Sequence, residues 1–140
     1  MSARTHEGGC QCGAVRYVTT AQPQRAIACH CSSCKQRTGA LYGMGVYFLD
    51  AEVQFNDGEL RSYVFNSDTS DRWFSNEFCV RCGTAITWTL EMRPGVRGIA
   101  GGSFDDPNWF NVDTHIWTRS ARPDMCYPAG MEVHEKTAPQ

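Results

Sequence analysis

Three cysteines lie within six residues of this chain, in the segment CHCSSC: Cys29, Cys31 and Cys34. Disulfides use thiols in pairs and a closed tetrahedral zinc site takes four ligands, so three thiols suit neither arrangement. Three protein ligands with one exchangeable position are the arrangement of a catalytic zinc ion. The triplet is therefore predicted to hold a metal ion with one coordination position open to a substrate.

Four further cysteines form two close pairs, in CQCG and CVRCG, and a glycine follows each pair. This spacing is typical of a tight turn whose backbone N–H groups point at the sulfur atoms. Two such pairs complete a four-sulfur zinc site, which has no position for a substrate and adds binding free energy to folding. We expect this structural site to tie the N-terminal strand to the middle of the sheet, with the ligands Cys10, Cys12, Cys79 and Cys82.

Other interpretations of the cysteines stay open from the sequence alone. The four paired residues could be ordinary buried thiols or disulfides, and Cys31 with Cys34 could form a redox switch. Cys126 or a histidine could close the triplet into a second structural site. By default, Cys126 is expected to be a buried thiol and His115 a core histidine with satisfied hydrogen bonds.

Charged residues near the triplet are the candidate substrate contacts. Lys35 and Arg37 put positive charge close to the thiolates, where they would offset negative charge and attract a carboxylate-bearing ligand. His30 lies between two predicted ligands and is expected to face away from the metal or to orient a ligand.

The composition places limits on the class of protein. The chain has 140 residues, and we expect one domain over residues 1–140 with an ordered core over about 6–135. A formal net charge of -2 gives no electrostatic reason to expect a nucleic acid or a membrane as partner. The start of the sequence, MSARTHEGGC, lacks the apolar segment of a secretory signal, and no apolar run could span a bilayer. We expect a cytoplasmic protein, where clustered cysteines more often bind metal than form disulfides.

The segments that must position these residues are predicted to be β-strands. Segments rich in Val, Tyr, Phe, Thr and Trp predict a mostly β fold, over residues 14–20, 40–49, 52–65, 71–78, 84–91, 114–118 and 131–137. Asp57-Gly58 predicts a tight antiparallel hairpin within the third segment. One short helix is expected over residues 32–39, capped by Ser32 or Ser33 and ended by Gly39. The end of the sequence, HEKTAPQ, is expected to be a flexible tail.

The segments GGCQCGAVRY, CHCSSCKQRTG, FCVRCGT and GGSFDDP stand in this order along the chain. In these motifs the chain resembles, over nearly its whole length, the glutathione-dependent formaldehyde-activating (Gfa) enzymes and their centromere-protein-V-like relatives. The resemblance implies a β-tent fold of antiparallel sheets tied by a four-cysteine zinc site. It implies a structural zinc on the four paired cysteines and a second, catalytic zinc on the triplet.

The resemblance also implies a carbon–sulfur lyase type of enzyme, which adds glutathione or a related thiol reversibly to formaldehyde or a related small electrophile. Metal coordination would turn the thiol into a thiolate nucleophile. His30, Asp105 and Asp106 are the candidates for protonating the hemithioacetal oxygen, although an Asp in a DDP segment commonly forms a turn.

The alternative function is a zinc-stabilised domain that binds or carries a thiol or peptide without catalysis. In either case tryptophans could line a ligand groove, although most are expected in the core. These residues are Trp73, Trp88, Trp109 and Trp117.

Overall fold

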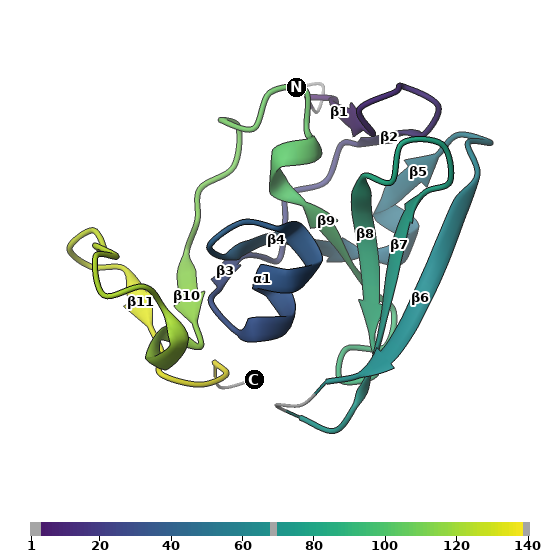
Figure 1. Ribbon diagram of the computed structural model, residues 1–140. Helices are drawn as coiled ribbons and strands as arrows, with labels where there is room; N and C mark the ends of the chain where they lie inside the picture. The colour runs from purple at the N-terminus through teal and green to yellow at the C-terminus, as the bar shows by residue number, and fades with distance from the viewer. Residues whose placement is uncertain (1–3, 68–69, 139–140) are drawn as a thin grey trace.

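The computed structural model describes residues 4–67 and 70–138, and within these ranges the chain is mostly β (Figure 1). The α-helix of this part is α1 (Ser32–Thr38), and the 3-10 helices are η1 (Asp50–Glu52), η2 (Gly101–Ser103) and η3 (Thr118–Ser120). The strands are β1 (His6–Gly9), β2 (Arg16–Thr19), β3 (Arg25–Cys29), β4 (Gly43–Leu49), β5 (Val53–Phe55), β6 (Leu60–Asn66), β7 (Trp73–Cys79), β8 (Ala85–Leu90), β9 (Val96–Ala100), β10 (Thr114–Ile116) and β11 (Glu132–Val133). The predicted fold class is confirmed.

The strands form two sheets. The small sheet has the order β1-β2-β5, and the large, eight-stranded sheet has the order β11-β10-β3-β4-β9-β8-β7-β6. Neighbouring strands are antiparallel except at β10, which runs parallel to both β3 and β11. The predicted antiparallel sheets thus include one parallel edge, because the long segment after β9 returns the chain to β3 in the same direction.

β4 has different neighbours on its two faces. Val46 and Phe48 are fully buried in the hydrophobic core, which contains residues of both sheets. Successive side chains of a strand point to opposite faces, so Gly43, Gly45 and Tyr47 share the other face. α1 packs beside β4 and lies in the middle of the molecule in Figure 1. The large sheet thus has one face in the core and one face toward α1.

The predicted hairpin at Asp57-Gly58 is wrong. β5 pairs with β2 and β6 pairs with β7, so this turn joins two different sheets. Asn56 shapes the turn, because its Oδ1 accepts hydrogen bonds from the N–H groups of Arg16 at 2.9 Å and Gly58 at 3.0 Å. Gly58 serves close packing and not a positive φ, since a Cβ there would collide with the carbonyl oxygen of Ala14.

α1 lies where the helix was predicted, but a different residue caps its N-terminus. Gly39 ends it with φ 70°, as expected. The N-cap is Cys31, whose Sγ accepts a hydrogen bond from the N–H of Cys34 at 3.4 Å, and is neither Ser32 nor Ser33. No helix within the described ranges is long and apolar enough to cross a membrane.

The structure contains strands that the sequence did not indicate. β1 and β9 contain glycines, which lower strand propensity, and β3 is short and runs directly into the triplet. Each of the seven predicted segments overlaps at least one strand.

The segment predicted as a flexible tail is hydrogen-bonded where the structure describes it. The N–H of His134 donates to the carbonyl oxygen of His115 at 2.9 Å, and the N–H of Trp117 donates to that of Lys136 at 3.0 Å. Ala138 is buried. Residues 134–138 are therefore attached along β10, and residues 139–140 lie outside the described ranges.

Candidate metal centres and their cleft

Two clusters of cysteine sulfur atoms lie in the structure. Within each cluster, all Sγ atoms lie within 4.8 Å of one another. Each cluster could hold a metal ion. The first consists of Cys10, Cys12, Cys79 and Cys82, and the second of Cys29, Cys31 and Cys34.

The four-cysteine cluster joins hairpins of different sheets. Cys10 and Cys12 lie in the turn between β1 and β2, whereas Cys79 ends β7 and Cys82 follows it. The Sγ of Cys12 lies 3.5 Å from that of Cys10 and 3.8 Å from that of Cys79. Four sulfurs at the usual zinc distance are about 3.8 Å apart in a tetrahedron, so the cluster fits zinc. It would tie the small sheet to a strand near the edge of the large sheet, and not to its middle.

The two turns share a backbone pattern that explains their glycines. The N–H of Gly13 donates to the carbonyl oxygen of Cys10 at 3.1 Å, and the N–H of Gly83 donates to that of Cys79 at 2.9 Å. Both glycines have positive φ, 81° and 79°, which other residues adopt at a cost. The N–H of Val15 donates to the Sγ of Cys10 at 3.3 Å, which stabilises the thiolate form that binds metal.

Thr84 connects the two turns. Its Oγ1 accepts a hydrogen bond from the N–H of Gln11 at 3.2 Å and is within hydrogen-bond distance, 3.2 Å, of the Sγ of Cys82. The hydrogen bond between Thr84 and Cys82 is the largest of the effects that lower the pKa of Cys82 to about 5. The cluster is therefore prepared to present a thiolate at neutral pH.

The triplet lies where β3 passes into α1. Cys29 ends β3, Cys31 caps α1, and Cys34 lies in the first turn of the helix. Gly43 faces this turn from β4, and a Cβ there would lie 3.0 Å from the Cβ of Cys34. Across the described ranges, no further Cys, His, Asp or Glu joins these sulfurs. Neither Cys126 nor a histidine closes the triplet, which offers three ligand atoms.

Hydrogen bonds among the three thiols favour negative charge on one of them. Contacts with Cys29 and Cys34 lower the pKa of Cys31, whereas contacts with Cys31 and Cys34 raise the pKa of Cys29. The Nη2 of Arg37 lies 3.8 Å from the Sγ of Cys34. The guanidinium also stacks over Trp88, with Cζ 4.1 Å from the ring centroid. Arg37 thus places a positive charge next to a sulfur atom of the triplet.

His30 belongs to a separate aromatic cluster. Its side chain is fully buried, and its Nε2 lies 2.9 Å from the Nδ1 of His115. The rings of Tyr42 and Tyr127 pack against this pair. Burial lowers the pKa of His30, so the imidazole stays neutral. His115 is the buried, hydrogen-bonded histidine that the sequence predicted.

Two further residues that the sequence linked to the triplet have other roles in space. Lys35 donates from Nζ to the carbonyl oxygen of Ser120, which attaches α1 to η3. Cys126 is exposed rather than buried, because it lies in the irregular segment between η3 and β11, with its Sγ 3.8 Å from the carbonyl oxygen of Asp124.

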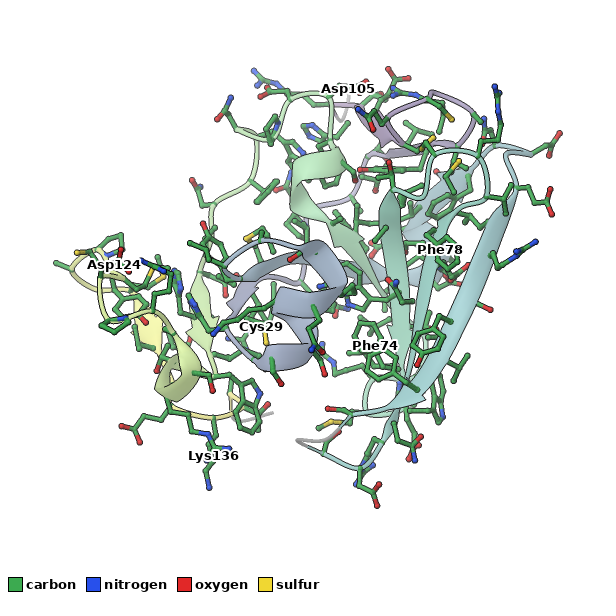
Figure 2. The ribbon with its side chains drawn as sticks, viewed as in Figure 1. Cys29, Phe74, Phe78, Asp105, Asp124 and Lys136 are labelled. Carbon is green, nitrogen blue, oxygen red and sulfur yellow. The ribbon has the colours of Figure 1, made fainter. Side chains whose placement is uncertain are left out.

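The two predicted aspartates lie away from the triplet. Asp105 forms an ion pair with Arg16, which lowers the pKa of the Asp105 carboxyl. Figure 2 shows Asp105 near the top of the view and Cys29 near its centre. The Oδ1 of Asp106 accepts a hydrogen bond from the N–H of Asn108 at 3.0 Å, which is typical of an Asp that forms a turn.

The triplet opens into a cleft of about 200 Å³ between α1, the large sheet and the segment after β10. Arg37 is the cation beside the sulfurs, and Arg72 lies farther along the lining. Among the described residues, the rest of the lining is mainly apolar and aromatic, with hydroxyl groups on Ser33, Ser67, Ser70, Thr137 and Tyr47. The aromatic members are Tyr47, Phe65, Trp73, Phe74 and Trp117.

The tryptophans divide between the cleft and the interior. Trp73 and Trp117 line the cleft, Trp88 is almost fully buried, and Trp109 packs against the core with its ring centroid 5.3 Å from that of Phe104.

Comparison with known proteins identifies the family. The model of the family described as "Glutathione-dependent formaldehyde-activating enzyme" (GFA) matches residues 5–120. The chain belongs to this family. The range of the GFA match includes both cysteine clusters and Tyr47, Phe74 and Trp117 of the cleft.

Individual relatives agree with the family match. A Halomonas elongata protein with a provisional name as a glutathione-dependent formaldehyde-activating enzyme is 30% identical over 94 residues. The alignment covers 62% of this chain and 57% of that protein, so the chain spans little more than half the length of this relative. The crystal structure of a Rhodobacter sphaeroides protein has a TM-score of 0.56 at 22% identity, over 75% of this chain and 90% of that one. The latter similarity concerns the fold.

Proposed function

We propose that this protein is a zinc-dependent carbon–sulfur lyase that adds glutathione, or a related thiol, reversibly to formaldehyde. The observation that carries the proposal is a triplet of sulfur ligands that opens into a cleft beside the guanidinium of Arg37. A structural zinc on the four-cysteine cluster would hold the two sheets together. We place the reaction in the cytoplasm, since a reducing compartment keeps the cluster thiols free to bind metal.

The reaction forms one carbon–sulfur bond. A zinc ion held by Cys29, Cys31 and Cys34 would supply a Lewis acid with a position for the substrate thiol, which it would keep deprotonated. The thiolate sulfur attacks the formaldehyde carbon, and the electron pair of the carbonyl π bond moves to oxygen. The oxygen gains a proton and S-hydroxymethylglutathione results. The cleft contributes by holding the two reactants together.

Arg37 provides the contact for a glutathione carboxylate. Its Nη2 lies beside the Sγ of Cys34, but its Nη1 is buried and has no hydrogen-bond partner among the described residues. A buried donor without an acceptor is unfavourable, so a ligand carboxylate at Nη1 would remove this cost. Trp88 fixes the orientation of the guanidinium by stacking.

We predict that Arg37→Met raises the KM for glutathione about tenfold or more, because a hydrogen bond to a charged group contributes about 1.5–3 kcal/mol. Arg37→Lys should recover only part of the affinity, since an ammonium lacks the planar fork. The matched control is Arg61→Met on exposed β6, which should leave the KM unchanged. An unchanged KM in Arg37→Met, with zinc content intact, would rule out this contact.

The activity is tested by measuring the rate of adduct formation between glutathione and formaldehyde by proton NMR. At about pH 6 the spontaneous addition is slow because little free thiolate is present. The wild-type protein should accelerate adduct formation and breakdown by the same factor, since a catalyst leaves the equilibrium unchanged. Glutathione binding in calorimetry without acceleration would instead support the carrier function.

A further inference from the structure

Tyr47 lies on the face of β4 that points toward the cleft. It shares this face with Gly43 and Gly45, which have no side chains to fill the space between β4 and α1. Tyr47 is half-buried and lines the cleft together with Cys29, Cys31 and Cys34. Its hydroxyl is therefore a polar group that β4 directs toward the site.

The hydrogen bonding of Tyr47 leaves its proton available. Its hydroxyl oxygen accepts a hydrogen bond from the Nε1 of Trp88 at 3.2 Å. An indole N–H only donates, so the phenolic O–H of Tyr47 is not used in this contact. Within residues 4–67 and 70–138, no acceptor takes this proton. The tyrosine is thus oriented by one hydrogen bond and keeps its own donor for a ligand.

Trp88 is held in place on several sides. It is 1% exposed, and Arg37 stacks over its ring. A Cβ on Gly98 would collide with the Nε1 edge of the indole, and one on Gly45 would lie 2.8 Å from its Cζ2. Two glycines thus make room for the indole beside Tyr47. A donor fixed in this way before the substrate arrives needs little reorganisation during the reaction.

We propose that Tyr47 is a catalytic residue of the reaction proposed above, and that its hydroxyl donates a hydrogen bond and then a proton to the oxygen of formaldehyde as the carbon–sulfur bond forms. The inference rests on the proposed function and names the group that protonates the adduct. The thiol proton has gone to solvent before attack. The adduct oxygen takes the phenolic proton, and water restores it to Tyr47, so the net reaction is thiol plus formaldehyde giving the hydroxymethyl thioether.

The protonation state of Tyr47 suits this role. Burial raises the pKa of Tyr47 to about 12, so the phenol carries its proton throughout the physiological range. The residues that the sequence indicated as acids do not line the cleft: His30 is turned to His115 and Asp105 to Arg16.

The experiment compares Tyr47→Phe with wild type in the adduct assay at about pH 6, with both proteins loaded with zinc. Removal of one donor to a developing oxyanion commonly costs about 100-fold in kcat. We expect a loss of about this size with the KM for glutathione within about twofold, because the thiol binds to other groups. Tyr63→Phe, which removes a hydroxyl from an exposed residue of β6, should match the wild type.

Three results would separate the inference from the proposed function. An active wild type whose Tyr47→Phe variant keeps its kcat overturns the role of Tyr47 and leaves the proposed function intact. A variant that loses kcat only because it has lost zinc or folded structure, as measured by metal analysis and circular dichroism, also overturns it. A wild type that does not accelerate adduct formation overturns the proposed function and the inference together.

Discussion

Replacing Cys79 by serine should lower the melting temperature by about 20 °C or more, or abolish the cooperative transition. Structural zinc sites contribute about 10–16 kcal/mol, which equals or exceeds the total stability of a typical domain. Cys79 is 1% exposed, and its Sγ lies 3.8 Å from the Sγ of Cys12. A serine at this position would therefore remove a buried sulfur ligand. Calorimetry of the zinc-loaded proteins measures the effect.

The matched control for this variant is Cys126→Ser, because Cys126 is exposed and belongs to neither cluster. It should melt as the wild type does. Cys12→Ser should be as unstable as Cys79→Ser, although Cys12 is exposed, because it would remove a ligand of the same ion. A Cys12→Ser variant of wild-type stability would contradict a structural metal at this cluster.

Replacing Cys31 by serine should reduce the rate of adduct formation by about 100-fold or more, with a small change in melting temperature. The variant has two sulfur ligands left in the triplet, too few to hold the ion. The helix should persist, because serine is a favoured N-cap residue. Its hydroxyl oxygen can accept the hydrogen bond that the N–H of Cys34 donates to the sulfur of Cys31. Loss of function and loss of stability are therefore expected to separate.

Metal analysis gives a second readout for Cys31→Ser. It should lose one zinc equivalent relative to wild type, while the four-cysteine cluster keeps its own. If Cys31→Ser were as unstable as Cys79→Ser, the division into a structural and a substrate-binding cluster would be wrong. Retention of the full rate by Cys31→Ser would contradict a role of the triplet in the chemistry.

The membership of both clusters could be predicted from the sequence because ligand spacing is a local property. A turn that brings Cys10 and Cys12 together, with Gly13 at positive φ, needs only neighbouring residues. The substrate side of the site depends instead on where side chains point. Lys35 and Arg37 have equal charge and lie two residues apart, yet Lys35 bonds to η3 and Arg37 reaches Cys34.

Tyr47 is a cleft residue that sequence reasoning missed. A signal for it was present: in GMGVY of β4 two glycines alternate with Tyr47 on one face, so this face must approach another element closely. The partner of Tyr47 on that face could not be inferred, because Trp88 comes from a distant part of the chain. The hairpin at Gly58 was mispredicted for a related reason, since local turn chemistry does not reveal which sheet receives the next strand.

Titration of the cobalt-substituted protein with glutathione tests most directly whether the triplet holds a metal with a position open to a thiol. With cobalt in both clusters, the visible spectrum should contain contributions of two sulfur-bound ions. Glutathione should change the bands of one ion in a saturable way, and Cys34→Ser should abolish this response while the bands of the other ion persist. Bands that do not respond to millimolar glutathione, or a response that survives in Cys34→Ser, would contradict the account.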